Sequence, residues 1–143
     1  MLDRERILEK IDLAERWADR VETYRPVTLE SYREEDIRRA ATERALQVTI
    51  EALVDAASLF VSGLRLGLPD SEATMIDTLE DDVLSAEEAA LLDDLRGFRN
   101  VLVHQYGDLD DERVFELAVD LPGDARTLTE AYRAALDRKA DET

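Results

Sequence analysis

Apolar side chains recur every three or four residues along most of this chain, the spacing that gathers them on one face of an α-helix. The first such stretch covers about residues 4–24, and Pro26 follows its end. A second begins near Ser31, which forms a candidate capping box with Glu34, and continues to about Ser62. The apolar face of this second stretch is made mainly of small side chains, which predicts a long central helix that another helix approaches closely: Ala41, Ala45, Val48, Ala52, Ala56 and Leu59.

A loop containing glycine and proline follows, and a short helix is predicted over about residues 71–79. Ser85 and Glu88 form another candidate capping box, at the start of a helix that reaches residues 103–106. Gly107 can stop this helix, because glycine readily adopts the backbone conformation that ends one.

The rest of the chain is also predicted to be helical. Residues 111–119 form one stretch, Pro122 and Gly123 predict a break, and a last helix extends to about residue 140. The pattern therefore predicts an all-α, up-and-down bundle of about five helices, with no strand, in a single domain that spans residues 1–143.

Composition supports this interpretation. Hydrophobic residues fill 45% of the 143 positions, enough for one core, and the five Gly and three Pro favour helix over sheet. No apolar run approaches the roughly 18 residues of a membrane span. The charged N-terminus lacks the apolar segment of a signal peptide, so we expect a cytoplasmic protein with no membrane partner. The absence of cysteine excludes disulfides and thiolate chemistry.

The formal net charge is -17, from 35 acidic and 18 basic residues. The acidic residues are spread along the whole chain, which predicts a solvated acidic coat and suggests a halophilic source. Taken alone, this charge argues against nucleic-acid binding. The objection weakens at high ionic strength, because the Debye length falls to about 3 Å in 1 M salt. Local arginines then matter more than the total charge.

His104 is the only histidine in the chain. Any acid–base catalysis that uses imidazole near neutral pH must therefore use this residue. Arg99 lies five positions before it and Asn100 four positions before it, which adds a fixed cation and an amide. On a helical wheel His104 shares a face with Asn100 and lies opposite Leu95, which belongs to the apolar stripe. A catalytic histidine and an ordinary exposed histidine both remain open.

Tyr106 adds a phenol two positions after His104. In a continuous helix the two side chains would point about 200° apart. They can share a site only if the helix frays or turns after His104, which Gly107 permits. The alternative is a tyrosine that packs against the end of the helix.

Two segments carry a resemblance to a known family. Residues 95–110 (LRGFRNVLVHQYGDLD) are similar to the signature of the HepT-like toxins, which belong to the HEPN superfamily of all-helical ribonucleases. That signature is an arginine, four to six residues, a histidine, and a tyrosine two residues later, and Arg99, His104 and Tyr106 match it. Gln105 stands where an acidic residue is common. Residues 43–57 (ERALQVTIEALVDAA) also resemble the family, and the similarity covers nearly the whole chain.

The resemblance implies a toxin that is a metal-independent endoribonuclease and needs no cofactor. When RNA is cleaved through its 2′-hydroxyl, a base removes the hydroxyl proton and an acid protonates the leaving oxygen. A cation such as Arg99 stabilises the charge that builds on the phosphate, while Asn100 binds the phosphate or orients His104. The family forms homodimers, which would bring two copies of His104 to one cleft.

Besides RNA, the implied partner is an MntA-like nucleotidyltransferase antitoxin that transfers AMP from ATP to Tyr106. The added phosphate and base would fill the cleft beside Arg99 and His104 and oppose RNA binding. ATP would belong to the partner. The alternative is a non-catalytic HEPN helical module that binds a nucleotidyltransferase. The presence of Arg99, Asn100 and His104 together favours the enzyme.

Other groupings carry weaker signals. Glu51 and Asp55 lie four apart on the second helix and could act as paired carboxylates, but ion pairs or hydrogen bonds with arginines, Arg99 among them, fit better. The acidic segment over residues 108–111 lacks the spacing and glycine of an EF-hand. With one histidine and no cysteine, we expect no metal site.

Overall fold

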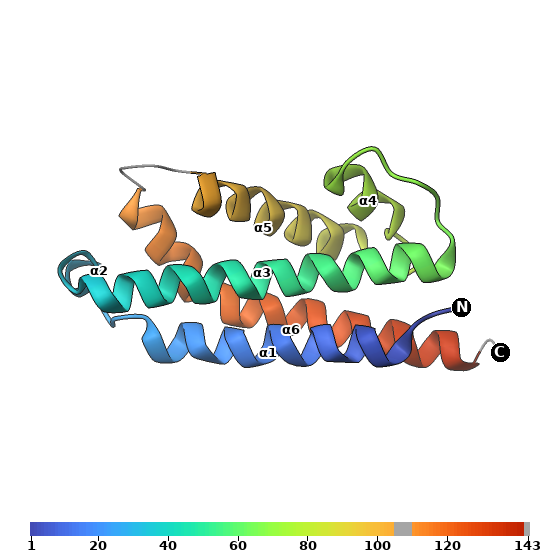
Figure 1. Ribbon diagram of the computed structural model, residues 1–143, viewed down its shortest axis with the longest axis horizontal. Coiled ribbons are helices and arrows are strands. Elements are labelled where there is room, and N and C mark those ends of the chain that lie inside the picture. The colour runs from blue at the N-terminus through green and yellow to red at the C-terminus, as the bar shows by residue number, and fades with distance from the viewer. Residues whose placement is uncertain (105–109, 142–143) are drawn as a thin grey trace.

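The computed structural model describes residues 1–104 and 110–141 (Figure 1). This part contains six helices and no β-strand beyond one isolated bridge, which confirms the all-α prediction. The helices are α1 (Arg4–Tyr24), α2 (Leu29–Glu34), α3 (Asp36–Leu64), α4 (Glu72–Thr78), α5 (Ala86–His104) and α6 (Asp111–Asp141).

The central helix is α3, as its small apolar side chains predicted. Figure 1 shows α1 and the main part of α6 along one side of α3, and α4 and α5 along the other. Ala45, Ala52 and Ala56 are fully or almost fully buried, which lets neighbouring helices approach the α3 backbone. The short helix α2 closes one end of the bundle, while the N-terminus lies at the opposite end (Figure 1).

The apolar content of α3 bears on the expected absence of a membrane span. By length and mean hydropathy alone, α3 could cross a membrane, although its apolar positions are not consecutive. In the structure 61% of its most apolar window is buried inside the bundle. The same residues therefore serve as the core of a packed helical protein.

The helix predicted to run from Ser31 to Ser62 is instead two helices. Thr28, and not Ser31, caps the start of α2, because its side-chain oxygen accepts a hydrogen bond from the Ser31 amide at 3.1 Å. Glu35 then leaves the helical conformation, with φ -96° and ψ 84°. The Arg39 guanidinium donates a hydrogen bond to the Arg33 carbonyl at 2.6 Å. This carbonyl lies in the last turn of α2, where carbonyl groups have no partner within the helix.

The break predicted at Pro122 is also absent, because α6 is one helix through this position. Its first turns lean away from the remainder (Figure 1), so the helix bends instead of ending. A proline inside a helix costs about 3 kcal/mol through a lost hydrogen bond and a clash. Ala118, Leu121 and Ala125 lie on both sides of Pro122 and are completely buried, and this packing offsets the cost. The bend carries the start of α6 toward the end of α5 (Figure 1).

Side-chain caps fix the first residues of α4 and α5. Ser85 and Glu88 form the predicted capping box: the Glu88 amide donates to Ser85 Oγ at 3.1 Å, and the Ser85 amide donates to Glu88 Oε1 at 2.8 Å. Ser71 caps α4 by accepting a hydrogen bond from the Thr74 amide at 3.1 Å. These caps set the positions of α4 and α5 relative to the preceding loops.

Tyr132 joins α6 to α3, and its loss is expected to weaken the bundle. Its buried hydroxyl donates to the Leu53 carbonyl at 2.8 Å. Tyr132→Phe removes this bond without changing the ring, so we expect a loss of about 1–2 kcal/mol in the free energy of unfolding. Denaturant titration measures it. Tyr24→Phe is the control, because the half-exposed Tyr24 has no hydroxyl partner among the described residues. Equal stability of both variants would contradict the role of this bond.

A candidate active site on the last turns of α5

Arg99 lies near the end of α5 and is the most buried basic residue among the ion pairs that the structure describes. Its side chain is 16% exposed, and it pairs with Glu72, the first residue of α4. Both terminal nitrogens take part: Nη2 donates to Glu72 Oε1, and Nη1 donates to Oε2 at 3.4 Å. Nη2 also donates to Asn100 Oδ1 at 3.3 Å. Two helices thus hold this guanidinium.

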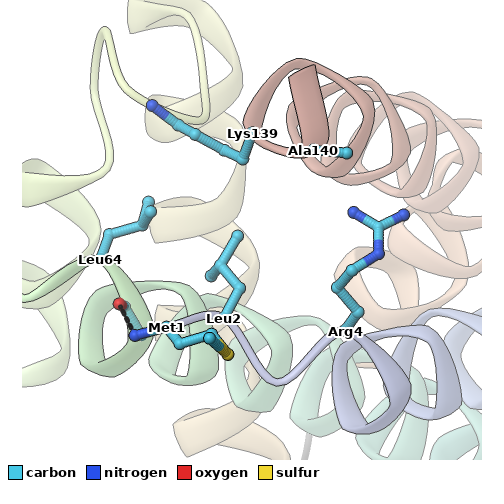
Figure 2. A pocket seen from close by; sticks show the side chains of 7 residues that line it. Met1, Leu2, Arg4, Leu64, Lys139 and Ala140 are labelled. Atoms are coloured by element: carbon cyan, nitrogen blue, oxygen red, sulfur yellow. Dashed lines mark hydrogen bonds between the residues drawn. The ribbon is translucent and has the colours of Figure 1, made fainter. Parts of the chain in front are cut away.

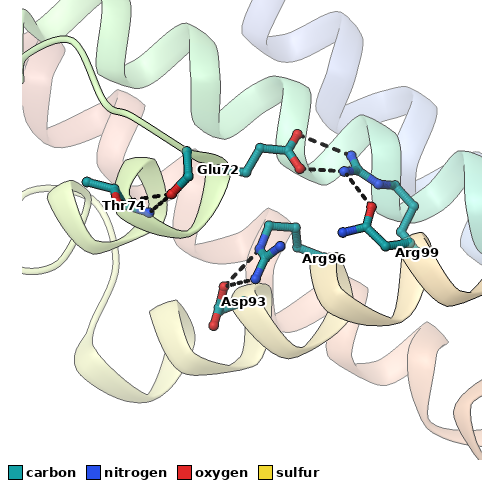
Figure 3. Close-up of polar contacts among 7 residues, drawn as sticks. Glu72, Thr74, Asp93, Arg96 and Arg99 are labelled. Atoms are coloured by element: carbon teal, nitrogen blue, oxygen red, sulfur yellow. Dashed lines mark hydrogen bonds and ion pairs between the residues drawn. The ribbon is translucent and has the colours of Figure 1, made fainter.

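A second arginine lies one turn earlier on α5. Arg96 pairs with Asp93 through Nε and Nη2, both at 2.9 Å from Asp93 Oδ1. Figure 3 shows this pair beside the Arg99–Glu72 pair, with the carboxylate of Glu72 directed at the guanidinium of Arg99. The acidic partners of the two arginines lie on different helices: Asp93 belongs to α5, like Arg96, whereas Glu72 belongs to α4.

The other predicted site residues lie at the limit of the described chain. His104 is the last residue of α5, so its backbone is helical, as predicted, and Gln105 follows it outside the described residues. The side chain of His104 and all of Tyr106 also lie outside them. The expected direction of the imidazole, and whether Tyr106 shares a site with His104, therefore remain predictions. Asn100 is exposed and contacts Arg99.

Glu51 and Asp55 do not pair with Arg99. Glu51 accepts a hydrogen bond from Gln47 Nε2 at 3.1 Å, and Asp55 forms an ion pair with Lys10 of α1 at 3.2 Å. The expectation that arginines bind these two carboxylates is therefore wrong, because their partners in the structure are a glutamine and a lysine. The reason is geometric: α1 and α5 pack against different sides of α3, and a four-residue spacing alone does not show which neighbour an acid faces.

Sequence reasoning missed Glu72. It precedes Arg99 by 27 positions and begins a short helix after a serine cap, where an acidic residue is ordinary. No local pattern connects it with the motif. Only the packing of α4 against α5 brings the two charges together.

A polar pair made by the completely buried Tyr32 and the partly buried Glu43 was also missed. The Tyr32 hydroxyl donates to Glu43 Oε1 at 3.2 Å, between α2 and α3. Burial raises the pKa of the Glu43 carboxyl, while the hydrogen bond from Tyr32 lowers it in part. Burial and the charge of Glu43 raise the pKa of the Tyr32 hydroxyl. The Tyr32 ring lies 5.7 Å from that of Phe115, so Tyr32 also joins α2 to the first turns of α6.

A cavity lies at the end of the bundle that contains the N-terminus. Its volume is about 550 Å³, and Figure 2 shows Leu2, Arg4, Leu64 and Lys139 around it. Arg4 also donates to the Leu136 carbonyl at 2.7 Å. The lining is mostly apolar and lacks an acid–base pair, and the last turn of α5 runs toward the other end of the bundle (Figure 1). The cavity is therefore separate from the candidate site.

Among the side chains that the structure describes, which do not include that of His104, no three acidic groups lie close enough together to hold a metal ion. Arg99 itself supplies a fixed cation, which can bind an anion such as a phosphate.

Comparisons with known proteins agree on one family. Residues 8–130 match the family described as ribonuclease HepT-like. The chain is 28% identical over 107 residues to a tRNA nuclease HepT from Aphanizomenon flos-aquae (strain 2012/KM1/D3), an alignment that covers 74% of this chain and 73% of that protein.

Solved structures have the same fold. A tri-AMPylated HEPN toxin from Shewanella oneidensis, in complex with MNT antitoxin, superposes with a TM-score of 0.82 and 21% identity, over 94% of this chain and 99% of that one. The cytosolic protein YutE from Bacillus subtilis superposes with a TM-score of 0.81 and 22% identity, over 96% and 93% of the two chains. At these identities the likeness shows the fold.

Proposed function

Because the chain belongs to the ribonuclease HepT-like family, we propose that it is the toxin of a toxin–antitoxin pair and an endoribonuclease that needs no metal. The observation that carries the proposal is the placement of Arg99, a mostly buried cation held at the end of α5 on the helix that His104 completes. We expect this activity in the cytoplasm, because the proposed RNA substrate and the ATP used by the proposed antitoxin are present there.

The proposed reaction breaks the bond between phosphorus and the 5′-oxygen of the next nucleotide. A base removes the proton of the 2′-hydroxyl, whose oxygen attacks the phosphate, and an acid protonates the departing 5′-oxygen. Arg99 stabilises the negative charge that develops on the phosphate. Asn100, in contact with Arg99, is placed to hydrogen-bond the same phosphate or His104.

One histidine per chain cannot act as base and acid at the same instant. We therefore propose a two-fold homodimer in which two copies of His104 face one cleft, one as base and one as acid. The net charge of -17 would repel RNA over a shorter range at the high ionic strength expected for a halophilic source, because the Debye length falls. RNA at the cleft would then interact mainly with the local arginines.

The proposed antitoxin is an MntA-like nucleotidyltransferase that adds AMP to Tyr106. The Shewanella oneidensis toxin, similar in fold, is described as tri-AMPylated and in complex with an MNT antitoxin. Tyr106 follows His104 by two positions, so an AMP group there would bring negative charge and bulk close to the imidazole.

The test is RNA cleavage by the purified protein at high salt, with tRNA among the substrates because one relative is a tRNA nuclease. We expect cleavage that persists in a metal chelator and leaves cyclic-phosphate ends, and we expect a dimer by light scattering. Cleavage lost in chelator would contradict the metal-independent mechanism. A monomer that cleaves would exclude the composite site. A protein that binds the antitoxin but cleaves no RNA would be the non-catalytic module.

A further inference from the structure

Glu72 is the one residue outside the predicted motif that forms a hydrogen bond or ion pair with the Arg99 side chain in the described part of the chain. Ser71 caps α4 and so fixes the backbone of Glu72 at the first helical position. Its side chain is 41% exposed, against 16% for Arg99, so the carboxylate bridges from the surface to a more buried cation. In Figure 3 it extends from α4 toward α5 and meets Arg99 end-on.

The atoms used by this ion pair decide which side of Arg99 is left for a ligand. A guanidinium has two double-donor edges: an end-on edge made by Nη1 and Nη2, and a side-on edge made by Nε and Nη2. Glu72 occupies the end-on edge with both carboxylate oxygens. The side-on edge meets only the carboxamide of the exposed Asn100, through Nη2 at 3.3 Å, among the described residues.

The neighbouring pair on α5 shows the opposite arrangement. Asp93 occupies the side-on edge of Arg96, through Nε and Nη2. Of the two arginines, only Arg99 therefore keeps its side-on edge clear of a carboxylate in the described structure. A phosphate, with two oxygens at the spacing of that edge, can displace the Asn100 carboxamide while Glu72 stays in place.

We propose that Glu72 is a positioning residue of the nuclease site, which anchors the end-on edge of Arg99 so that its side-on edge is presented to the scissile phosphate. This inference rests on the proposed function. Anchoring fixes the cation before the reaction, so that no reorientation is needed when charge builds on the phosphate. Glu72 also balances one charge of the semi-buried guanidinium in the RNA-free protein.

Substitution of Glu72 can distinguish its effect on the position of Arg99 from its effect on the local electrostatic potential. Glu72→Gln keeps the size of the side chain and one acceptor but loses the second acceptor oxygen, so we expect kcat to fall by about tenfold or more. Asp93→Asn is the matched control, because it also removes one negative charge beside α5 but leaves the anchor of Arg99 intact. Both variants lose one charge, so any shared change in KM reports the local potential. A fall in kcat confined to Glu72→Gln reports positioning.

A rescue experiment asks whether the carboxylate itself holds a guanidinium at this place. In Arg99→Ala, added guanidinium ion at concentrations below those that unfold the protein is expected to restore part of the cleavage. In Arg99→Ala combined with Glu72→Gln, half-maximal rescue should need several-fold more guanidinium, because its anchor is gone. A role of Glu72 in folding alone would leave this concentration unchanged.

The outcomes separate this inference from the proposed function. If the wild type cleaves RNA and Glu72→Gln keeps its kcat, Glu72 does not position Arg99, although the nuclease stands. Faster cleavage by Glu72→Gln would make Glu72 a competitor of the phosphate and would overturn the inference. Equal rescue of the single and double variants would also overturn it. If the wild type cleaves no RNA while it is folded and dimeric, the proposed function fails, and this inference fails with it.

Discussion

His104→Ala is expected to lose RNA cleavage by a factor of about 10³, within the range of 10²–10⁴ that a positioned acid or base contributes. The chain contains no second histidine to take over the proton transfers. Single-turnover cleavage of RNA at high salt measures the loss. Helical content and thermal melting, recorded in parallel, show whether the variant is folded. We expect both to match the wild type, because His104 is the last residue of α5 and helix ends tolerate substitution.

Arg99 provides the companion test. Arg99→Ala should lose activity to a similar degree, and Arg99→Lys should recover part of it, because lysine supplies the charge but not the double-donor edge. A His104→Ala variant that still cleaves at the wild-type rate would remove the histidine from the mechanism. An unfolded His104→Ala variant would assign it a structural role.

Most of the fold was predictable from the sequence, because apolar periodicity and helix caps are local signals. The Ser85–Glu88 box lies where the pattern placed it, and three residues of the predicted face of α3 are buried: Ala45, Ala52 and Ala56. The two errors arose where tertiary contacts outweigh local preference. Arg39 supports the break between α2 and α3 by donating to a carbonyl six residues earlier, and buried neighbours keep α6 helical through Pro122.

The candidate site was predictable only along one helix. Arg99, Asn100 and His104 were predicted from a motif. Asn100 and His104 are four residues apart, the spacing that puts two side chains on one face of a helix, and Arg99 is next to Asn100. The contact between Glu72 and Arg99 spans 27 positions and depends on how a seven-residue helix packs. Nothing in the local composition around Glu72 distinguishes it from other acids in a chain with 35 of them.

Modification of Tyr106 by the cognate nucleotidyltransferase is expected to silence the nuclease. When the toxin, this partner and ATP are incubated together, the tyrosine oxygen attacks the α-phosphate of ATP, pyrophosphate leaves, and AMP remains on Tyr106. The added AMP would lie two positions from His104, where the negative charge of its phosphate repels the RNA backbone and its bulk occupies the cleft. Intact-protein mass spectrometry follows the addition, and peptide mapping locates it.

Tyr106→Phe separates modification from catalysis. This variant should take up no AMP and should stay active in the presence of the partner and ATP, because the phenol oxygen that accepts AMP is missing. It should also keep most of its cleavage rate, since phenylalanine preserves the ring. Tyr24→Phe is the matched control and should be modified and silenced like the wild type. Complete loss of cleavage in Tyr106→Phe would give the phenol a direct part in the reaction. If the partner instead silences the wild type without any AMP uptake, binding of the partner alone blocks the cleft, and no covalent modification is required to exclude RNA.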